Sequence, residues 1–256
     1  MPGWGYPIVT MVIVILFWHF LVAGFGIPEY LIPLPAVVAK YIFYKWNFLL
    51  AHALITTYET IAGFLLSILV GVPLAIVIVW SKILDKSITP FLVLSQTFPK
   101  VAIAPLLIIW FGLGMLPKIL VSFLVAFFPV IISEVTGMRS VETETMELIH
   151  SMQATPLQTF WKIRLPYALP HLFAGLKVAI AFAIVGAVVG EWVVADKGLG
   201  YVLLWASGNL DTPMLFSVFV ILMGIGVILY YAIVWLERLF IPWHVSIRET
   251  ALQPTM

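Results

Sequence analysis

The chain has 256 residues, of which 63% are hydrophobic and 10% are charged, and its mean hydropathy is +1.13. A soluble domain carries about 25% charged residues, so this composition excludes one and predicts a polytopic membrane protein. The net charge of +1 gives no indication of a nucleic-acid partner, and the lack of cysteine excludes disulfides and thiolate metal sites.

Six stretches are apolar enough and long enough to cross a membrane, which takes about 20 residues. We expect an all-α protein with one transmembrane domain over residues 1–256. No basic residue precedes the first stretch, so it is interpreted as a retained helix and not as a signal peptide. A proline-bearing connection, residues 29–47, follows it. The predicted spans are residues 7–26, 53–80, 88–111, 116–138, 172–195 and 213–236.

A polar insert, residues 139–171, separates the fourth and fifth predicted spans. Ser140 can cap a helix with an acidic first turn, which is expected to reach about Met152. A polar helical insert in so apolar a chain indicates that something outside the bilayer contacts it. The alternative is an amphipathic helix that lies on the inner leaflet, for which Leu157, Phe160 and Trp161 have helical spacing.

A second helix is predicted to start at Thr155. Threonine suits the N-cap, Pro156 suits the first helical position, and Gln158 completes a capping box. This helix is expected to end at Leu165, since the residue before Pro166 disfavours the α region. The restart favours two short helices that project at an angle over one flat amphipathic helix.

Residues 147–166 resemble the cytoplasmic coupling loop, or EAA loop, of ABC importer permeases. Glu147-Leu148-Ile149 occupies the E-A-A positions, and Ile163-Arg164-Leu165-Pro166 matches the closing I-x-L-P. The family glycine falls on Gln153. We therefore expect this bend to use an ordinary φ, with Thr155 and Pro156 setting the turn.

The resemblance extends over about residues 50–244. Residues 99–114, residues 186–200 and Pro242-Trp243 are similar to the branch that carries sulfonates, taurine, nitrate and pyrimidine precursors. It implies the type I importer permease fold with six transmembrane helices and a cytoplasmic coupling helix. The residues that it assigns to ATPase coupling are Glu147, His150, Gln153, Ala154, Thr155, Pro156, Phe160, Leu165 and Pro166.

The same resemblance implies the partners. They are a second permease copy, most simply as a homodimer, two ATPase subunits, and a periplasmic or lipid-anchored solute-binding protein. The location implied is the cell inner membrane. Basic residues are more frequent in the connections on the side of the insert than on the other side, where Lys118 and Lys197 lie. This bias predicts cytoplasmic termini and a cytoplasmic insert.

The chain lacks G-x-x-x-x-G-K-[ST], H-E-x-x-H and G-x-S-x-G, and its histidines are scattered singly. It therefore has no phosphate-binding loop, no metal-site motif and no recognisable catalytic motif of its own. We expect no enzyme activity and no cofactor in this chain, with ATP and Mg bound by the separate ATPase.

Three ionisable residues lie within the predicted spans, where each costs roughly 2.5–3.5 kcal/mol or more. They are Glu59, Lys100 and Glu191. One interpretation makes them groups of the substrate pathway or gate. The other makes them internal ion pairs, such as Lys100 with Glu191, or, for Glu59, a place near the outer interface.

Pro99 and Pro105 flank Lys100 and interrupt the third predicted span. Broken helices at membrane depth are tolerated where they line a cavity, so the break and the charge point to the pathway; a simple kink is the alternative. Gln96, Phe98 and Trp110 could then bond to and stack on a planar solute.

The solute suggested is a small organic molecule, with an aromatic or heterocyclic vitamin precursor favoured over a sulfonate, nitrate or similar anion. A secondary transporter is the alternative from another class, although it would usually show an internal repeat, and the sequence shows none. Gly186 and Gly190 form a small-xxx-small pair that is typical of close helix contacts.

Overall fold

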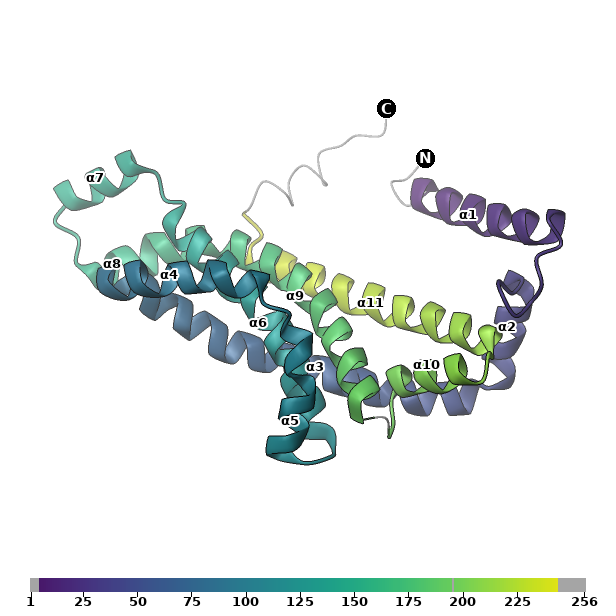
Figure 1. Cartoon of the computed structure of the whole chain (residues 1–256). Coiled ribbons are helices and arrows are strands. Elements are labelled where there is room, and N and C mark those ends of the chain that lie inside the picture. The colour runs from purple at the N-terminus through teal and green to yellow at the C-terminus, as the bar shows by residue number, and fades with distance from the viewer. Residues whose placement is uncertain (1–4, 195, 244–256) are drawn as a thin grey trace.

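The computed structural model describes residues 5–194 and 196–243, in which every regular element is a helix. They form an elongated bundle with α7 at one end and α2 at the other (Figure 1). The helices are α1 (Gly5–Gly24), α2 (Pro35–Tyr44), α3 (Trp46–Trp80), α4 (Lys82–Thr97), η1 (Lys100–Ile103), α5 (Ala104–Phe111), α6 (Met115–Arg139), α7 (Thr143–Ser151), α8 (Pro156–Thr159), η2 (Phe160–Arg164), α9 (Leu165–Val194), α10 (Leu199–Gly208) and α11 (Thr212–Phe240).

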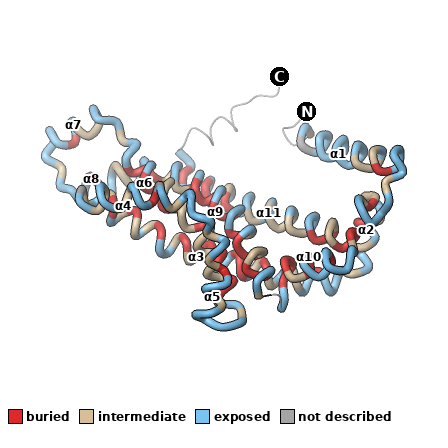
Figure 2. The backbone as a smooth tube through the Cα atoms, viewed as in Figure 1, coloured by how far each residue is buried: buried red, intermediate tan, exposed pale blue. Residues whose placement is uncertain are grey.

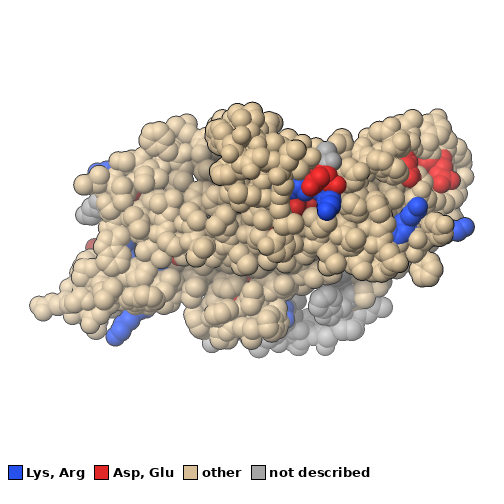
Figure 3. All heavy atoms as spheres, turned by 90° about the horizontal axis from the view of Figure 1, so that it is seen from below, with Lys and Arg blue, Asp and Glu red and all other residues tan. Residues whose placement is uncertain are grey.

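Helices α3, α6 and α9 pack together as the core, and α11 lies against α9. One cluster of buried side chains joins them, with Phe64 from α3, Val130 from α6, Ile180 from α9 and Ile233 from α11. Figure 2 shows buried residues gathered along these helices, whereas α1 and α7 are mostly exposed. The face seen in Figure 3 carries few charged side chains, as expected for a surface that meets lipid.

Close approach of α6 and α9 depends on glycine. A Cβ on Gly186 would lie 2.7 Å from Ser122 Cα, and one on Gly190 would lie 2.8 Å from Lys118 Cα. No side chain fits at these distances. The predicted role of this glycine pair as a close helix contact is therefore confirmed.

Four helices are long and apolar enough to cross a membrane: α3, α6, the continuous helix Pro156–Val194, and α11. The third predicted span is a bent pair, Ile83–Thr97 and Lys100–Phe111, at an angle of 88°. The first corresponds to α1, whose apolar part, Ile8–Gly24, is shorter than the others. The arrangement is consistent with six predicted spans.

Two parts of the prediction need correction. The connection over residues 29–47 contains helix α2, which starts with Pro35 at its first position, and α3 begins at Trp46 and not near residue 53. Helix α10 was not predicted either. It occupies the connection between the fifth and sixth predicted spans, and at ten residues it is too short to have been recognised as a span.

The polar insert also differs from expectation at two points, the start of its first helix and the end of its second. Helix α7 starts after Glu142, because the Ser140 hydroxyl donates to the Gly137 carbonyl (2.8 Å) and so closes α6 instead of opening α7. The second helix does not stop before Pro166. A π turn at Phe160–Arg164, in which the Leu165 N–H donates to the Phe160 carbonyl, shifts the bonding register just before the proline. The chain thereby continues into α9 without a break.

We expect Gly186→Leu to destabilise the permease strongly, since the added side chain would force α6 and α9 apart. Gly224→Leu in α11 is the matched control, because nothing lies within 4 Å of a Cβ at that position. The measurement is the thermal unfolding midpoint of each purified variant in detergent. Equal midpoints for the two variants would contradict glycine-dependent packing of α6 on α9.

Candidate functional site

The segment of residues 141–159, here called the projecting loop, extends from the end of the bundle (Figure 1). Among the predicted coupling residues, Ala154 is half-buried and Phe160 is buried. Leu165 and Pro166 are half-buried in the first turn of α9. The exposed residues are Glu147, His150, Gln153, Thr155 and Pro156.

The bend of the projecting loop is a Schellman turn at the end of α7. The Gln153 N–H donates to the His150 carbonyl (3.0 Å), and the Ala154 N–H donates to the Ile149 carbonyl (3.3 Å). Gln153 has φ +53°, in the left-handed region that favours glycine. The expectation of an ordinary φ is therefore wrong, since the turn keeps the geometry for which glycine is suited.

The predicted capping box is present. The Gln158 N–H donates to Thr155 Oγ1 (3.3 Å), and the Thr155 N–H donates to Gln158 Oε1 (2.9 Å). Two otherwise unpaired N–H groups at the start of α8 are satisfied in this way. The box fixes the start of α8 directly after the bend.

Phe160 ties the projecting loop to the bundle. Its ring lies 5.5 Å from the Trp80 ring at the end of α3, and it packs with Met138 of α6 and Ala168 of α9. Because it is buried, Phe160 is suited to holding the loop and not to touching another protein.

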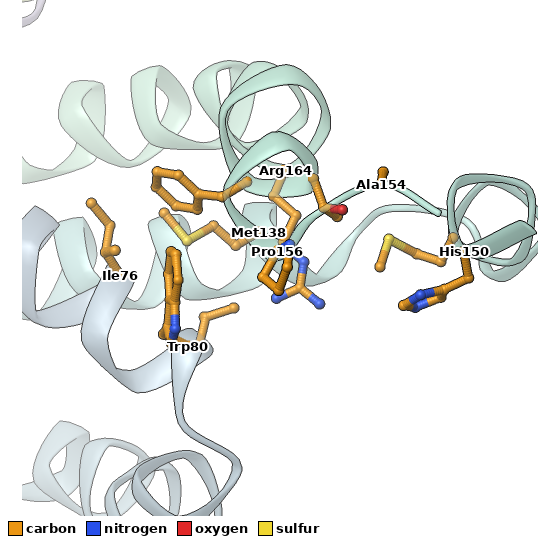
Figure 4. A pocket seen from close by; sticks show the side chains of 11 residues that line it. Ile76, Trp80, Met138, His150, Ala154, Pro156 and Arg164 are labelled. Atoms are coloured by element: carbon orange, nitrogen blue, oxygen red, sulfur yellow. The ribbon is translucent and has the colours of Figure 1, made fainter. Parts of the chain in front are cut away.

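A cavity of about 410 Å³ lies between the projecting loop and the ends of α3 and α6. In Figure 4, Ile76 and Trp80 stand on one side, His150 stands on the other, and Arg164 reaches between them. The cavity thus separates His150 of α7 from the ends of α3 and α6, while Phe160 packs against both of those helices.

The broken helix places Lys100 against an aromatic ring. Its Nζ lies 4.8 Å from the centroid of Phe128 in α6. Glu191 instead accepts hydrogen bonds from Thr56 and Gly200, so the suggested pair of Lys100 with Glu191 is wrong. The two residues belong to different regions of the bundle.

The structure brings together only some of the residues predicted around Lys100. Gln96 lines the same groove as Lys100. Phe98 and Trp110 are exposed, at 51% and 64%, and do not belong to that lining. Trp110 lies on α5, beyond the bend.

Lys118 was placed in an outer connection from the sequence, but it is 2% exposed in the first turn of α6. Its Nζ lies 3.3 Å from Glu59 Oε1 and donates to Asp196 Oδ1 (2.5 Å) and to the Lys197 carbonyl (3.1 Å). Partial burial raises the pKa of Asp196, but the hydrogen bond and charge of Lys118 outweigh it and hold that pKa below its ordinary value. The signal available in the sequence was a lysine next to a long apolar run.

Glu191 is fully buried and accepts a second set of hydrogen bonds near Lys118. The Thr56 hydroxyl and the Gly200 N–H each donate to its carboxylate at 2.6 Å. The Leu199 N–H donates to Thr56 Oγ1 (2.8 Å). These bonds attach the start of α10 to α3 and α9, and Glu59 and Glu191 both lie inside the bundle.

Sequence reasoning also missed Glu134. It is fully buried in α6, and among the described residues its carboxylate has no hydrogen-bond partner. Within the same residues, no group of three His, Asp or Glu side chains could hold a metal ion.

We expect Lys118→Met to lower the stability of the purified permease by about 3–5 kcal/mol, because Glu59 would remain buried without its cation. Lys197→Met is the control, since its exposed side chain is lost while its carbonyl stays. Thermal unfolding in detergent measures both.

The double variant Lys118→Met/Glu59→Gln should recover part of the loss, since it leaves no unpaired charge between α3 and α6. If Lys118→Met unfolds at the same temperature as Lys197→Met, the buried pair does not stabilise the bundle.

Comparisons with known proteins identify the family. Residues 63–243 match the model of the binding-protein-dependent transport system inner membrane component. A probable ABC transporter permease protein of Haemophilus influenzae is 36% identical over 93% of this chain and 97% of its own length. The formylaminopyrimidine transport permease protein ThiX of Halalkalibacterium halodurans is 32% identical, covering 93% and 95%. The riboflavin transport system permease protein RibX of Chloroflexus aurantiacus is 36% identical, covering 96% and 92%.

The fold agrees with a solved importer. A chain of the MetNI methionine ABC transporter in an inward-facing conformation superposes with a TM-score of 0.61 and 18% identity, covering 79% of this chain and 95% of that one. The predicted family and fold are confirmed, and with them the absence of a catalytic role. This chain belongs to the binding-protein-dependent transport system inner membrane components, and is a permease subunit of an ABC importer.

Proposed function

We propose that two copies of this permease form the translocation pathway of an importer for a small organic solute. Two ATPase subunits, which bind ATP and Mg, dock on the projecting loops. A periplasmic or lipid-anchored binding protein delivers the solute, and both termini of the permease lie in the cytoplasm. The family supports the ATPase and the binding protein as partners.

The observation that carries this proposal is the continuity of the helix Pro156–Val194. It begins at the capping box of the projecting loop and ends three residues after Glu191, whose carboxylate is buried. A displacement of the loop by closing ATPases is therefore passed along one helix to the end of α9. The π turn at Phe160–Arg164 directly follows the projecting loop, and such turns are frequently found at functional sites.

The solute that we favour is a heterocyclic vitamin or vitamin precursor, because relatives that cover nearly the whole chain are named for formylaminopyrimidine and riboflavin transport. A small anion such as a sulfonate or nitrate is the second candidate, favoured by Lys100, which takes part in none of the ion pairs among the described residues. Uptake of each radiolabelled compound into cells that carry the complete importer tests the choice.

Ala154→Asp tests the docking of the ATPase. A charge at the half-buried bend would have to be desolvated in the ATPase groove, at a cost of several kcal/mol. We expect the variant to insert normally but to lose the ATPase during affinity purification in detergent.

The matched control is Leu210→Asp. Leu210 is 76% exposed at another Schellman turn, φ +55°, at the end of α10. The Leu210→Asp variant should retain the ATPase. Full retention by Ala154→Asp would show that the projecting loop is not the docking element.

Gln153→Gly should strengthen the bend. A non-glycine residue in the left-handed region costs about 1–2 kcal/mol, and the greater freedom of glycine in the unfolded chain offsets part of that gain. We expect α7 to be stabilised by about 1 kcal/mol or less, with ATPase retention unchanged. Slower hydrogen exchange in the last turn of α7 is the measurement.

Gln153→Val should have the opposite effect, because a β-branched residue resists positive φ. Loss of the ATPase from Gln153→Gly would mean that the exposed glutamine side chain itself contacts the partner.

A further inference from the structure

A groove of about 380 Å³ lies at the elbow of the broken helix, where η1 meets α6 and α9. Its polar lining residues are Gln96, Lys100 and Ser133, its aromatic ones are Phe128 and Phe182, and the rest of the lining is aliphatic. We call it the Lys100 groove. Its volume is in the range of pockets that hold small organic ligands, about 300–1,000 Å³.

Lys100 is the only charged residue in the lining of this groove. The ion pairs among the described residues involve Lys118, Arg139 and Lys177, and Lys100 takes part in none of them. Its ammonium group instead lies over the Phe128 ring, 4.8 Å from the centroid. A cation–π contact is worth far less than a charge pair in a water-poor site, so this charge can still accept an anion.

The acidic side chains of the surrounding helices face elsewhere. Asp85 of α4 pairs with Arg139, and Glu191 of α9 bonds Thr56 and Gly200. Glu134 of α6 is fully buried and is not part of the lining. Within the described chain, the groove therefore combines one unpaired cation with two aromatic rings.

The backbone explains why a lysine can be held there. Phe98 is extended, and Pro99 follows with φ −72° and ψ 82°. At these two residues the chain bends by 88° between Ile83–Thr97 and Lys100–Phe111, and the second segment begins with a 3-10 turn from Lys100 to Ile103 that leads into α5. The break sets Lys100 on the inner side of the elbow, against α6. In an unbroken helix, Lys100 would project from the side of that helix and not into an elbow.

We propose that the Lys100 groove is a solute site that selects molecules with a planar ring and an anionic group. The ammonium of Lys100 receives the anion, Gln96 and Ser133 supply hydrogen bonds, and Phe128 and Phe182 contact the ring. This inference rests on the proposed function, since it defines the chemical class of the imported solute. A cationic ring compound would be repelled by Lys100.

The test uses the complex of the permease with its ATPase in phosphatidylcholine nanodiscs. Because the natural permease has no cysteine, Ser133→Cys introduces a single thiol into the groove. Two water-soluble methanethiosulfonates of similar size, one with a sulfonate and one with a trimethylammonium group, label it, and mass spectrometry of the permease gives each rate.

With Lys100 present, we expect the anionic reagent to react about tenfold faster, relative to the cationic one, than it does with Lys100→Met. Lys100→Arg should preserve the preference. Lys162→Met, which removes an exposed lysine of η2, is the control and should leave it unchanged. Nicotinate should slow the labelling, whereas nicotinamide, with the same ring and no charge, should not.

Several results would overturn the proposal. They are no labelling of Ser133→Cys by either reagent, a charge preference that survives Lys100→Met, and equal protection by nicotinate and nicotinamide. If phosphatidylglycerol nanodiscs abolish the preference while nicotinate has no effect, the groove holds a lipid headgroup and not a solute. ATPase retention by the same preparations separates these failures from failure of the importer assignment, because Lys100→Met should leave docking intact.

Discussion

One buried cation determines how the ends of α6 and α9 farthest from the projecting loop are built. Lys118 joins α6 to α3 through Glu59, and to the connection between α9 and α10 through Asp196 and the Lys197 carbonyl. Lys118 is 2% exposed, and burying its charge costs free energy unless all of these contacts are made. The need for all of them constrains α3, α6 and α9 to one arrangement. Gly190 allows it, because a Cβ there would lie 2.8 Å from Lys118 Cα.

The contacts in this region also hold the far end of the long helix that starts at the projecting loop. The helix Pro156–Val194 would transmit little if its far end were free to slide. Glu191 prevents this, since its carboxylate accepts hydrogen bonds from Thr56 of α3 and from the Gly200 N–H at the start of α10. At the other end, Phe160 fixes the helix against Trp80 and Met138. This helix is therefore held by side-chain contacts at both ends, and the π turn is the point of irregular bonding between the loop and the rest of the helix.

The sequence predicted those parts of the fold that depend on interactions between residues close together in the chain. Apolar length located the long spans, and Thr155 with Gln158 located the start of α8, because a capping box is formed within four residues. The failures involve contacts that are distant in sequence. The partners of Lys118 lie 59 and 78 residues away, so no spacing rule could have replaced the suggested pair of Lys100 with Glu191. Pro166 was misjudged because the π turn that accommodates it depends on how Phe160 packs under the projecting loop.

Lys118 and Lys100 show how packing separates structural charges from functional ones. Lys118 has a carboxylate partner, a second acidic contact and a carbonyl, all inside one chain, and nothing further is needed to balance it. Lys100 has an aromatic ring, a groove and no acidic neighbour in the lining of that groove. Holding such a charge at the elbow of a broken helix costs free energy in the empty permease. A site that is costly when empty gains most from a ligand of opposite charge, and loses that gain when the ligand leaves. A solute that must bind and then depart requires this incomplete satisfaction.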